Sequence, residues 1–151
     1  MNIEIAHAHC DIPCKVYDPA IAQFAALSVV RLIDLISELE DITSVKNAAQ
    51  LTRLVAQKEE HAQAVKNDVA TIWGDYFKGP QIEKYPDVHS LVHNIMQAAS
   101  KCKQGITRED GLALMTMVNE FAAMFWGSKD MEVETVVSPN LPNLDVVRPK
   151  S

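Results

Sequence analysis

The sequence predicts an all-α protein, a four-helix bundle that begins with a cysteine-containing loop and ends in an extended tail. Apolar residues recur at every third or fourth position in four separate stretches, which is the spacing of helices with one buried face. The 151 residues include only five glycines, and short polar turns separate the four stretches. Because no segment shows a convincing alternation of apolar and polar residues, we expect helices joined as antiparallel neighbours.

The first two helices carry clear end signals. The first is expected over residues 19–39, where Asp18 can cap the first turn and Pro19 suits the first helical position. The second covers residues 45–77 and is expected to end at Gly79 and Pro80. The turn between the two helices has the sequence EDITS.

The last two helices are expected over residues 86–103 and 107–125. Thr107 and Asp110 form an imperfect capping box, since the third helical position lacks the usual Glu or Gln. The tail, residues 131–151, is punctuated by prolines and is expected to be extended or disordered. The helical stretches and the loop before them are treated as one folded domain up to residue 130, followed by the tail; the boundary of this domain at residue 9, after a leader at 1–8, is implied by the family resemblance described below.

Composition excludes several classes of partner. The net charge of -6 disfavours nucleic acid and anionic membranes, which attract basic proteins. No window approaches the roughly 18 to 20 unbroken apolar residues of a membrane span.

The first eight residues, MNIEIAHA, lack the basic and long apolar regions of a secretory signal, so the expected location is the cytoplasm. Thiols remain reduced there, and closely spaced cysteines are more often metal ligands or catalytic groups than disulfides.

Most of the chemistry of this sequence is concentrated in HAHCDIPCKVYDP, residues 7–19. Cys10 and Cys14 lie four positions apart beside His9, and Pro13 stiffens the loop between them. Two thiolates with nitrogen donors suit Cu(I), zinc or square-planar Ni(II) better than magnesium or calcium. Zinc would need further ligands from elsewhere, and no second cysteine pair follows in the sequence.

Other candidate ligands have simpler explanations. Cys102 stands alone near the end of a helix and is expected to be a buried thiol without a redox role. His89 and His93 share one helical face at a spacing that can bind zinc, but no third ligand accompanies them.

Three blocks of the sequence resemble the nickel superoxide dismutase family. HCDIPCKVYDP, residues 9–19, is similar to the family's nickel-binding hook, except that Lys15 stands where glycine is usual. Residues 73–93, WGDYFKGPQIEKYPDVHSLVH, and residues 121–129, FAAMFWGSK, resemble two further blocks. The family has a four-helix bundle subunit that assembles into a hexamer, and both features are expected here by resemblance.

The resemblance also implies a ligand set. Cys10 and Cys14 would supply two thiolates, and the amide nitrogen of Cys10 a third donor. The α-amine of His9 would be the fourth donor and its imidazole the axial ligand. Since that amine must be free, the bond after Ala8 must be cut, so residues 1–8 would be a leader that a maturation peptidase removes.

Two tyrosines receive roles by resemblance, and Asp11 and His61 are assigned roles as hypotheses. Tyr17 and Tyr76 match the tyrosines that line the approach to the metal and order water, and Asp11 is expected to hold the shape of the hook. In well-known members a Glu and an Arg support the axial histidine, and the matching positions here are Ala25 and His61. We hypothesise that His61 or an ordered water takes over that support.

The implied function is disproportionation of superoxide to dioxygen and hydrogen peroxide through a Ni(II)/Ni(III) cycle. Anionic thiolate and amide donors would bring Ni(III) within reach. One alternative is a non-catalytic helical module that holds nickel, zinc or copper through the same residues. Another is a helical oligomer in which Cys10 and Cys14 form a labile disulfide. Lys15 would either attract the anionic substrate or simply point into solvent.

Overall fold

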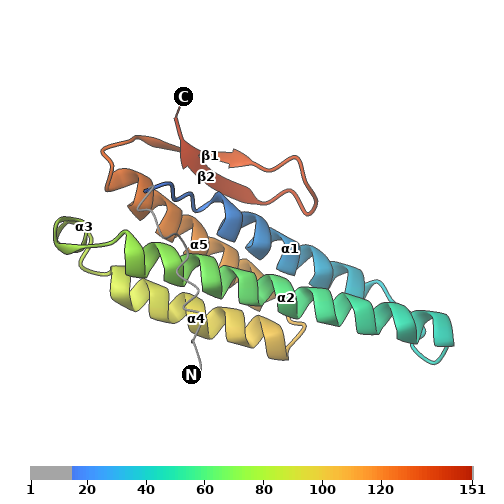
Figure 1. Cartoon of the computed structure of the whole chain (residues 1–151). Coiled ribbons are helices and arrows are strands. Elements are labelled where there is room, and N and C mark those ends of the chain that lie inside the picture. The colour runs from blue at the N-terminus through green and yellow to red at the C-terminus, as the bar shows by residue number, and fades with distance from the viewer. Residues whose placement is uncertain (1–14, 151) are drawn as a thin grey trace, which may run out of the picture.

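The structure, a computed structural model, describes residues 15–150 and consists of helices with one small sheet (Figure 1). The elements in chain order are α1 (Ala20–Ser37), α2 (Val45–Asp75), α3 (Gly79–Lys84), α4 (Val88–Gln104), α5 (Arg108–Gly127), β1 (Val133–Val137) and β2 (Asp145–Pro149). The four predicted helices are all present. The predicted bounds differ from the observed ones by only a few residues.

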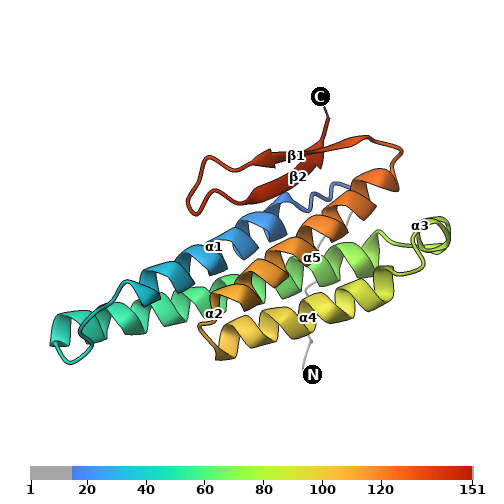
Figure 2. The same cartoon turned by 180° about the vertical axis from the view of Figure 1, so that it is seen from behind.

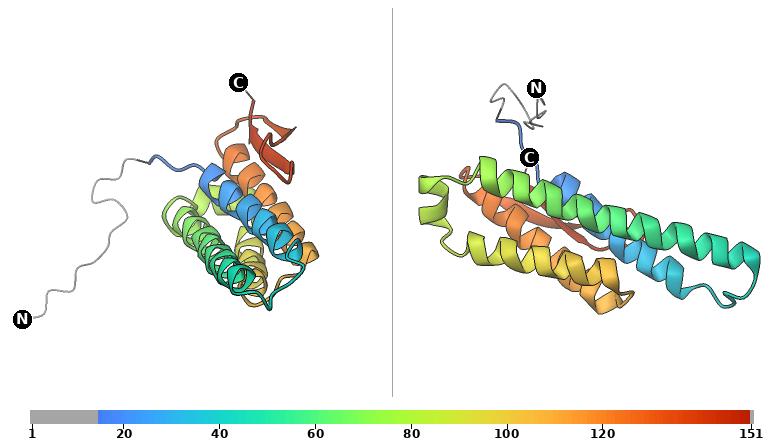
Figure 3. Two further views of the ribbon diagram at one scale, coloured as in Figure 1. Left: turned by 90° about the vertical axis from the view of Figure 1, so that its right-hand side faces the viewer. Right: turned by 60° about the horizontal axis from the view of Figure 1, so that its bottom comes forward.

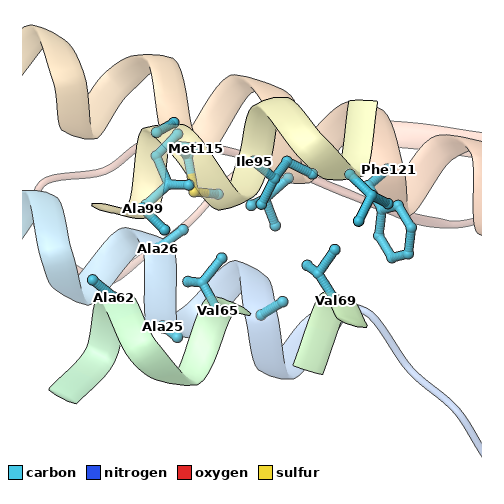
Figure 4. Close-up of a cluster of buried hydrophobic side chains, with 14 of the residues drawn as sticks. Ala25, Ala26, Ala62, Val65, Val69, Ile95, Ala99, Met115 and Phe121 are labelled. Carbon is cyan, nitrogen blue, oxygen red and sulfur yellow. The ribbon is translucent and has the colours of Figure 1, made fainter. Parts of the chain in front are cut away.

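The four long helices pack side by side around one apolar core. Helices α2 and α5 each contact both α1 and α4, as the end-on view in Figure 3 also shows. The centre of the core is made of small and branched side chains from α1 and α2 that face Ile95 and Phe121 on α4 and α5 (Figure 4). By length and composition alone α1 could cross a membrane, but half of it is buried inside the fold, as in a core helix.

Several helix ends follow their sequence signals. The carboxylate of Asp18 accepts a hydrogen bond from the amide of Ala20 at 2.8 Å, so the predicted cap of the first turn is confirmed. Thr107 does precede α5, but its side chain makes no capping hydrogen bond within the described residues. The short helix α3 was not predicted, because Pro80 was interpreted only as a stop signal, although proline also suits the first turn of a helix.

The tail forms a β-hairpin, which corrects the expectation of a purely α-helical chain. Strands β1 and β2 pair antiparallel, with Val133 opposite Pro149 and Val137 opposite Asp145. The hairpin lies along α5 and the beginning of α1 (Figure 2). The strands were not predicted, because the prolines between VETVV and DVVRP indicated an extended or disordered tail, although both segments are rich in β-branched residues.

Two amide side chains attach the hairpin to the helices. Gln23 on α1 is only 2% exposed, and its Nε2 donates to Oδ1 of Asn119 and to the carbonyl of Val147, both at 2.8 Å. Asn119 on α5 also donates to the carbonyl of Asp145 at 2.8 Å and accepts from the amide of Val147 at 3.2 Å. The tail is therefore extended, as predicted, but it is held by specific hydrogen bonds.

The bundle has two chemically different ends. At the carbonyl end, Lys58 of α2 is 1% exposed and its ammonium donates to the carbonyls of Cys102, Lys103 and Gly105, which close α4. Burial lowers the pKa of Lys58. At the opposite, aromatic end, α1 and α4 begin and α2 and α5 finish, and the rings gathered there are Tyr17, Tyr76, Phe77, Phe125 and Trp126.

Candidate functional site

The candidate site begins where the described chain begins. His9, Cys10, Asp11 and Cys14 lie outside the described residues, so their predicted roles stay predictions. Lys15, directly after Cys14, has a φ of 56°, in the left-handed region that favours glycine. Glycine, which is usual at this position in the family's hook, is therefore the residue that this backbone conformation favours.

Tyr17 and Tyr76, the two tyrosines predicted to line the approach, lie together. Their ring centroids are 6.2 Å apart and their planes are tilted by 56°. Tyr17 is on the segment that enters α1, and Tyr76 follows the last residue of α2. A cavity of about 60 Å³ adjoins Tyr17, and it is lined by Val16, Tyr17, Asp18, Ile21, Asp68, Thr71 and Ile72. Tyr17, three residues after Cys14, thus lies beside Tyr76 at the aromatic end.

The ring of Tyr76 is enclosed by other rings and one cation. The centroid of Phe125 lies 4.7 Å from that of Tyr76, and the centroid of Phe77 lies 5.3 Å away. The ammonium of Lys129 lies 5.3 Å from the Tyr76 centroid, 4.6 Å from that of Phe125 and 5.7 Å from that of Trp126. These contacts fix the plane of the phenol and place a positive charge next to it.

The hydroxyl of Tyr76 has a partner that sequence reasoning missed. It lies 2.7 Å from Oγ of Ser128, which in turn donates to the carbonyl of Phe125 at 2.6 Å. Ser128 is the residue directly after α5. The block FAAMFWGSK contains both Ser128 and Lys129, but nothing in its pattern indicates that the end of α5 meets the end of α2.

His61 lies well away from this pair of tyrosines. It precedes Tyr76 by fifteen residues, so about 22 Å of α2 separates the two backbones. Its surroundings are an open cavity of about 330 Å³ that includes Arg31 and the hairpin loop residues Asn140 and Leu141. Eight extended residues reach about 27 Å, so the length of chain between His9 and Tyr17 permits an approach to His61. The predicted support of His9 stays a prediction.

Ala25, the other position that departs from the family pattern, is in the core. It is buried on α1 in the same apolar cluster as Ala62, the neighbour of His61 (Figure 4). A methyl group at this position provides no hydrogen bond to a histidine ring.

The helical body offers no alternative metal centre among residues 15–150. No group of three or more His, Cys, Asp or Glu side chains converges within that range. Burial raises the pKa of Cys102 to about 11, so this thiol stays protonated at neutral pH. Residues 9–14, which lie outside the described range, contain two cysteines and a histidine, a donor set that suits a soft metal.

His89, one of the two histidines that share a helical face, has a structural explanation. The indole Nε1 of Trp73 donates to Nδ1 of His89 at 2.9 Å, and the two rings meet edge to face with centroids 5.7 Å apart. A neutral ring that accepts at Nδ1 carries its proton on Nε2, so neither nitrogen of His89 has a free lone pair for a metal.

Comparison with protein families gives one clear match. Residues 4–129 match the model of the family described as nickel-containing superoxide dismutase. Two curated relatives named "Superoxide dismutase [Ni]" are similar over 122 residues, one from Streptomyces coelicolor at 35% identity and one from Streptomyces seoulensis at 33%. Each match covers 81% of this chain and 88% of the relative. The hairpin strands lie beyond residues 4–129, which the family model matches.

Solved structures agree with the sequence comparison. A native structure of nickel superoxide dismutase superimposes with a TM-score of 0.73 at 34% identity, covering 81% of this chain and 99% of that chain. A structure described as having nickel ligation corresponding to the oxidized state gives the same score at 32% identity with the same coverage.

Proposed function

Because the chain belongs to the nickel-containing superoxide dismutase family, we propose that residues 9–14 hold its nickel next to the tyrosine pair at the aromatic end. The chain is a nickel-dependent oxidoreductase, and its substrate is superoxide. Two superoxide ions and two protons give dioxygen and hydrogen peroxide. This activity separates the chain from a passive metal module and from a helical oligomer without a cofactor.

The proposed ligands are His9, Cys10 and Cys14. Bound nickel supplies the one-electron redox chemistry, because thiolate and amide donors stabilise its higher oxidation state. Asp11 would hold the loop in shape through backbone hydrogen bonds. The observation that carries this proposal is the contact of Tyr17 with Tyr76, because Tyr17 is only three residues after Cys14.

The α-amine of His9 becomes a ligand only after the bond following Ala8 is cut. We therefore propose that residues 1–8 are removed before nickel binds, by a maturation peptidase. The ligands must also lose their protons on binding, so nickel loading is expected to fail at low pH.

The tyrosine pair is proposed to order water and to limit access to the metal. Tyr76 is held by rings and by Ser128, and Tyr17 packs against it from the base of the hook. The ammonium of Lys129 places one positive charge beside Tyr76, while Asp18 and Asp68 line the cavity at Tyr17. A local cation favours the approach of an anionic substrate.

The finer architecture is proposed by family membership. The four long helices are proposed to form the family's four-helix bundle, residues 9–19 its hook, and six subunits the hexamer. Support of the axial ring by His61 belongs to the same proposal, and a cytoplasmic location stays a prediction.

The deciding experiment compares two forms of the chain after the same nickel treatment, one beginning at His9 and one at Met1. We expect superoxide consumption only in the form that begins at His9. Tight metal binding by both forms with no turnover in either would instead support a passive metal module. A variant of the His9 form with Cys14→Ser provides the control, because it removes one thiolate without changing the N-terminus.

A further inference from the structure

We propose that Ser128 is a positioning residue that turns the hydroxyl proton of Tyr76 away from the approach to the hook. Tyr76 then faces that approach as a hydrogen-bond acceptor. The inference rests on the proposed function, which places Tyr76 at the approach to the nickel. It concerns a residue at the end of α5 that the sequence analysis left without a role.

The direction of the proton follows from counting hydrogens. Ser128 has one hydroxyl proton, and its Oγ lies 2.6 Å from the carbonyl oxygen of Phe125, which can only accept. The serine proton is therefore engaged with that carbonyl. Since Tyr76 and Ser128 are 2.7 Å apart and share a hydrogen bond, the proton between them must come from Tyr76. The two O–H groups thus point in the same direction, toward α5.

The groups around Tyr76 restrict movement of its ring. Phe77 and Phe125 contact it with centroids 5.3 Å and 4.7 Å away, and the ammonium of Lys129 lies 5.3 Å from its centroid. Only rotation about the C–O bond remains, and that rotation breaks the bond to Ser128. Ser128 therefore decides whether the phenol donates or accepts on its open side.

This arrangement assigns a definite role to Tyr76. With its proton engaged, its free lone pairs accept a hydrogen bond from water and orient that water with one hydrogen toward the ring. The two protons needed for hydrogen peroxide then come from water or from another group. Direct donation by Tyr76 would first require the loss of its bond to Ser128.

Neutron diffraction from crystals of the full chain, grown in D₂O, tests the geometry without any nickel. We expect deuterium on Oη of Tyr76 directed at Oγ of Ser128, and deuterium on Oγ of Ser128 directed at the carbonyl of Phe125. Deuterium on Ser128 directed at Tyr76 would overturn the proposal.

Kinetics of the nickel-loaded His9 form test the consequence for the reaction. Ser128→Ala removes the acceptor, and Ser128→Thr retains a hydroxyl. We expect Ser128→Ala to change turnover by about threefold or more and to alter its pH profile, and Ser128→Thr to preserve both. In a Tyr76→Phe background, Ser128→Ala should have no further effect, since Ser128 acts through the phenol. Thermal melting identifies any variant that simply fails to fold.

The outcomes separate the two proposals. An equal effect of Ser128→Ala in both backgrounds would show that Ser128 acts through the fold alone, and would overturn the inference. Tyr76→Phe with unchanged turnover would overturn the roles of both residues. An inactive His9 form with the native sequence would contradict the proposed function itself, whatever direction the neutron structure gives for the Tyr76 proton.

Discussion

Each end of the bundle contains a lysine, but the two lysines interact differently: one donates hydrogen bonds to carbonyls and the other lies against aromatic rings. At the carbonyl end, Lys58 is fully buried and its ammonium is satisfied by three backbone oxygens. At the aromatic end, Lys129 is exposed and its ammonium lies against three rings. The ammonium of Lys58 donates its hydrogens to carbonyl oxygens inside the fold, away from solvent. Ring faces attract the charge without neutralising it, so it still acts on an approaching anion.

We expect the largest loss of stability when Lys58 at the carbonyl end is replaced. Lys58→Met keeps the length of the side chain but leaves three carbonyls at the end of α4 without their donor, which costs about 3 kcal/mol of unfolding free energy. Urea unfolding of the full chain measures the loss. The control is Lys66→Met on the same helix, because the ammonium of Lys66 donates to the hydroxyl of Ser100 and, among residues 15–150, to no backbone carbonyl. An equal loss in both variants would contradict the role given to Lys58.

The hairpin provides the next largest effect. Asn119→Ala removes the hydrogen bonds that join α5 to Gln23 and to strand β2, at a cost of about 2 kcal/mol. Hydrogen exchange should accelerate in β1 and β2 and remain slow in the helices. Thr116→Ala on the same helix is the control, since its hydroxyl donates to the carbonyl of Leu112 within α5. Unchanged exchange in the hairpin would show that other contacts hold it.

Lys129→Met tests the aromatic end directly. Loss of the cation from the ring faces should cost about 1 kcal/mol of stability. Superoxide consumption by the nickel-loaded His9 form should also fall at low ionic strength and depend less on salt. Lys101→Met serves as the control, because Lys101 is at the carbonyl end and pairs with Asp110 at 3.5 Å. The same salt dependence in wild type and Lys129→Met would contradict a steering role.

Lys15→Gly should have the smallest effect, and in the opposite direction. Glycine relieves the left-handed backbone at φ 56° but makes the unfolded chain more flexible, so the net gain is about 0.5 kcal/mol. Thermal melting compares this variant with Lys15→Ala, which removes the same charge and keeps the strain. If the rate of Lys15→Gly depends on ionic strength as in the native sequence, Lys15 does not steer the substrate.

The same contrast explains what the sequence could predict. The four long helices were predictable because each one carries its own apolar period, as in residues 45–77, and its own end signals, such as Asp18. The hairpin was not, since β1 and β2 acquire a buried face only by packing on α1 and α5 through Gln23 and Asn119.

The site was predictable only in part, for a related reason. Tyr17 and Tyr76 were identified by resemblance to a family, and the structure brings their rings together. Ser128 was missed because its contact with Tyr76 joins residues 52 positions apart, at the ends of two helices. No local pattern specifies which helix ends meet in space.

The two aligned hydroxyls at the end of α5 have an electrostatic consequence. Their hydrogens point toward a carbonyl at the negative end of the helix, so their dipoles run head to tail with the oxygen of Tyr76 outermost. That oxygen presents a partial negative charge, which repels superoxide and attracts the hydrogens of water. The ammonium of Lys129, 5.3 Å from the centre of the same ring, opposes this repulsion. The hydroxyl oxygen of Tyr76 thus favours water, while the ammonium of Lys129 beside the same ring favours the superoxide anion.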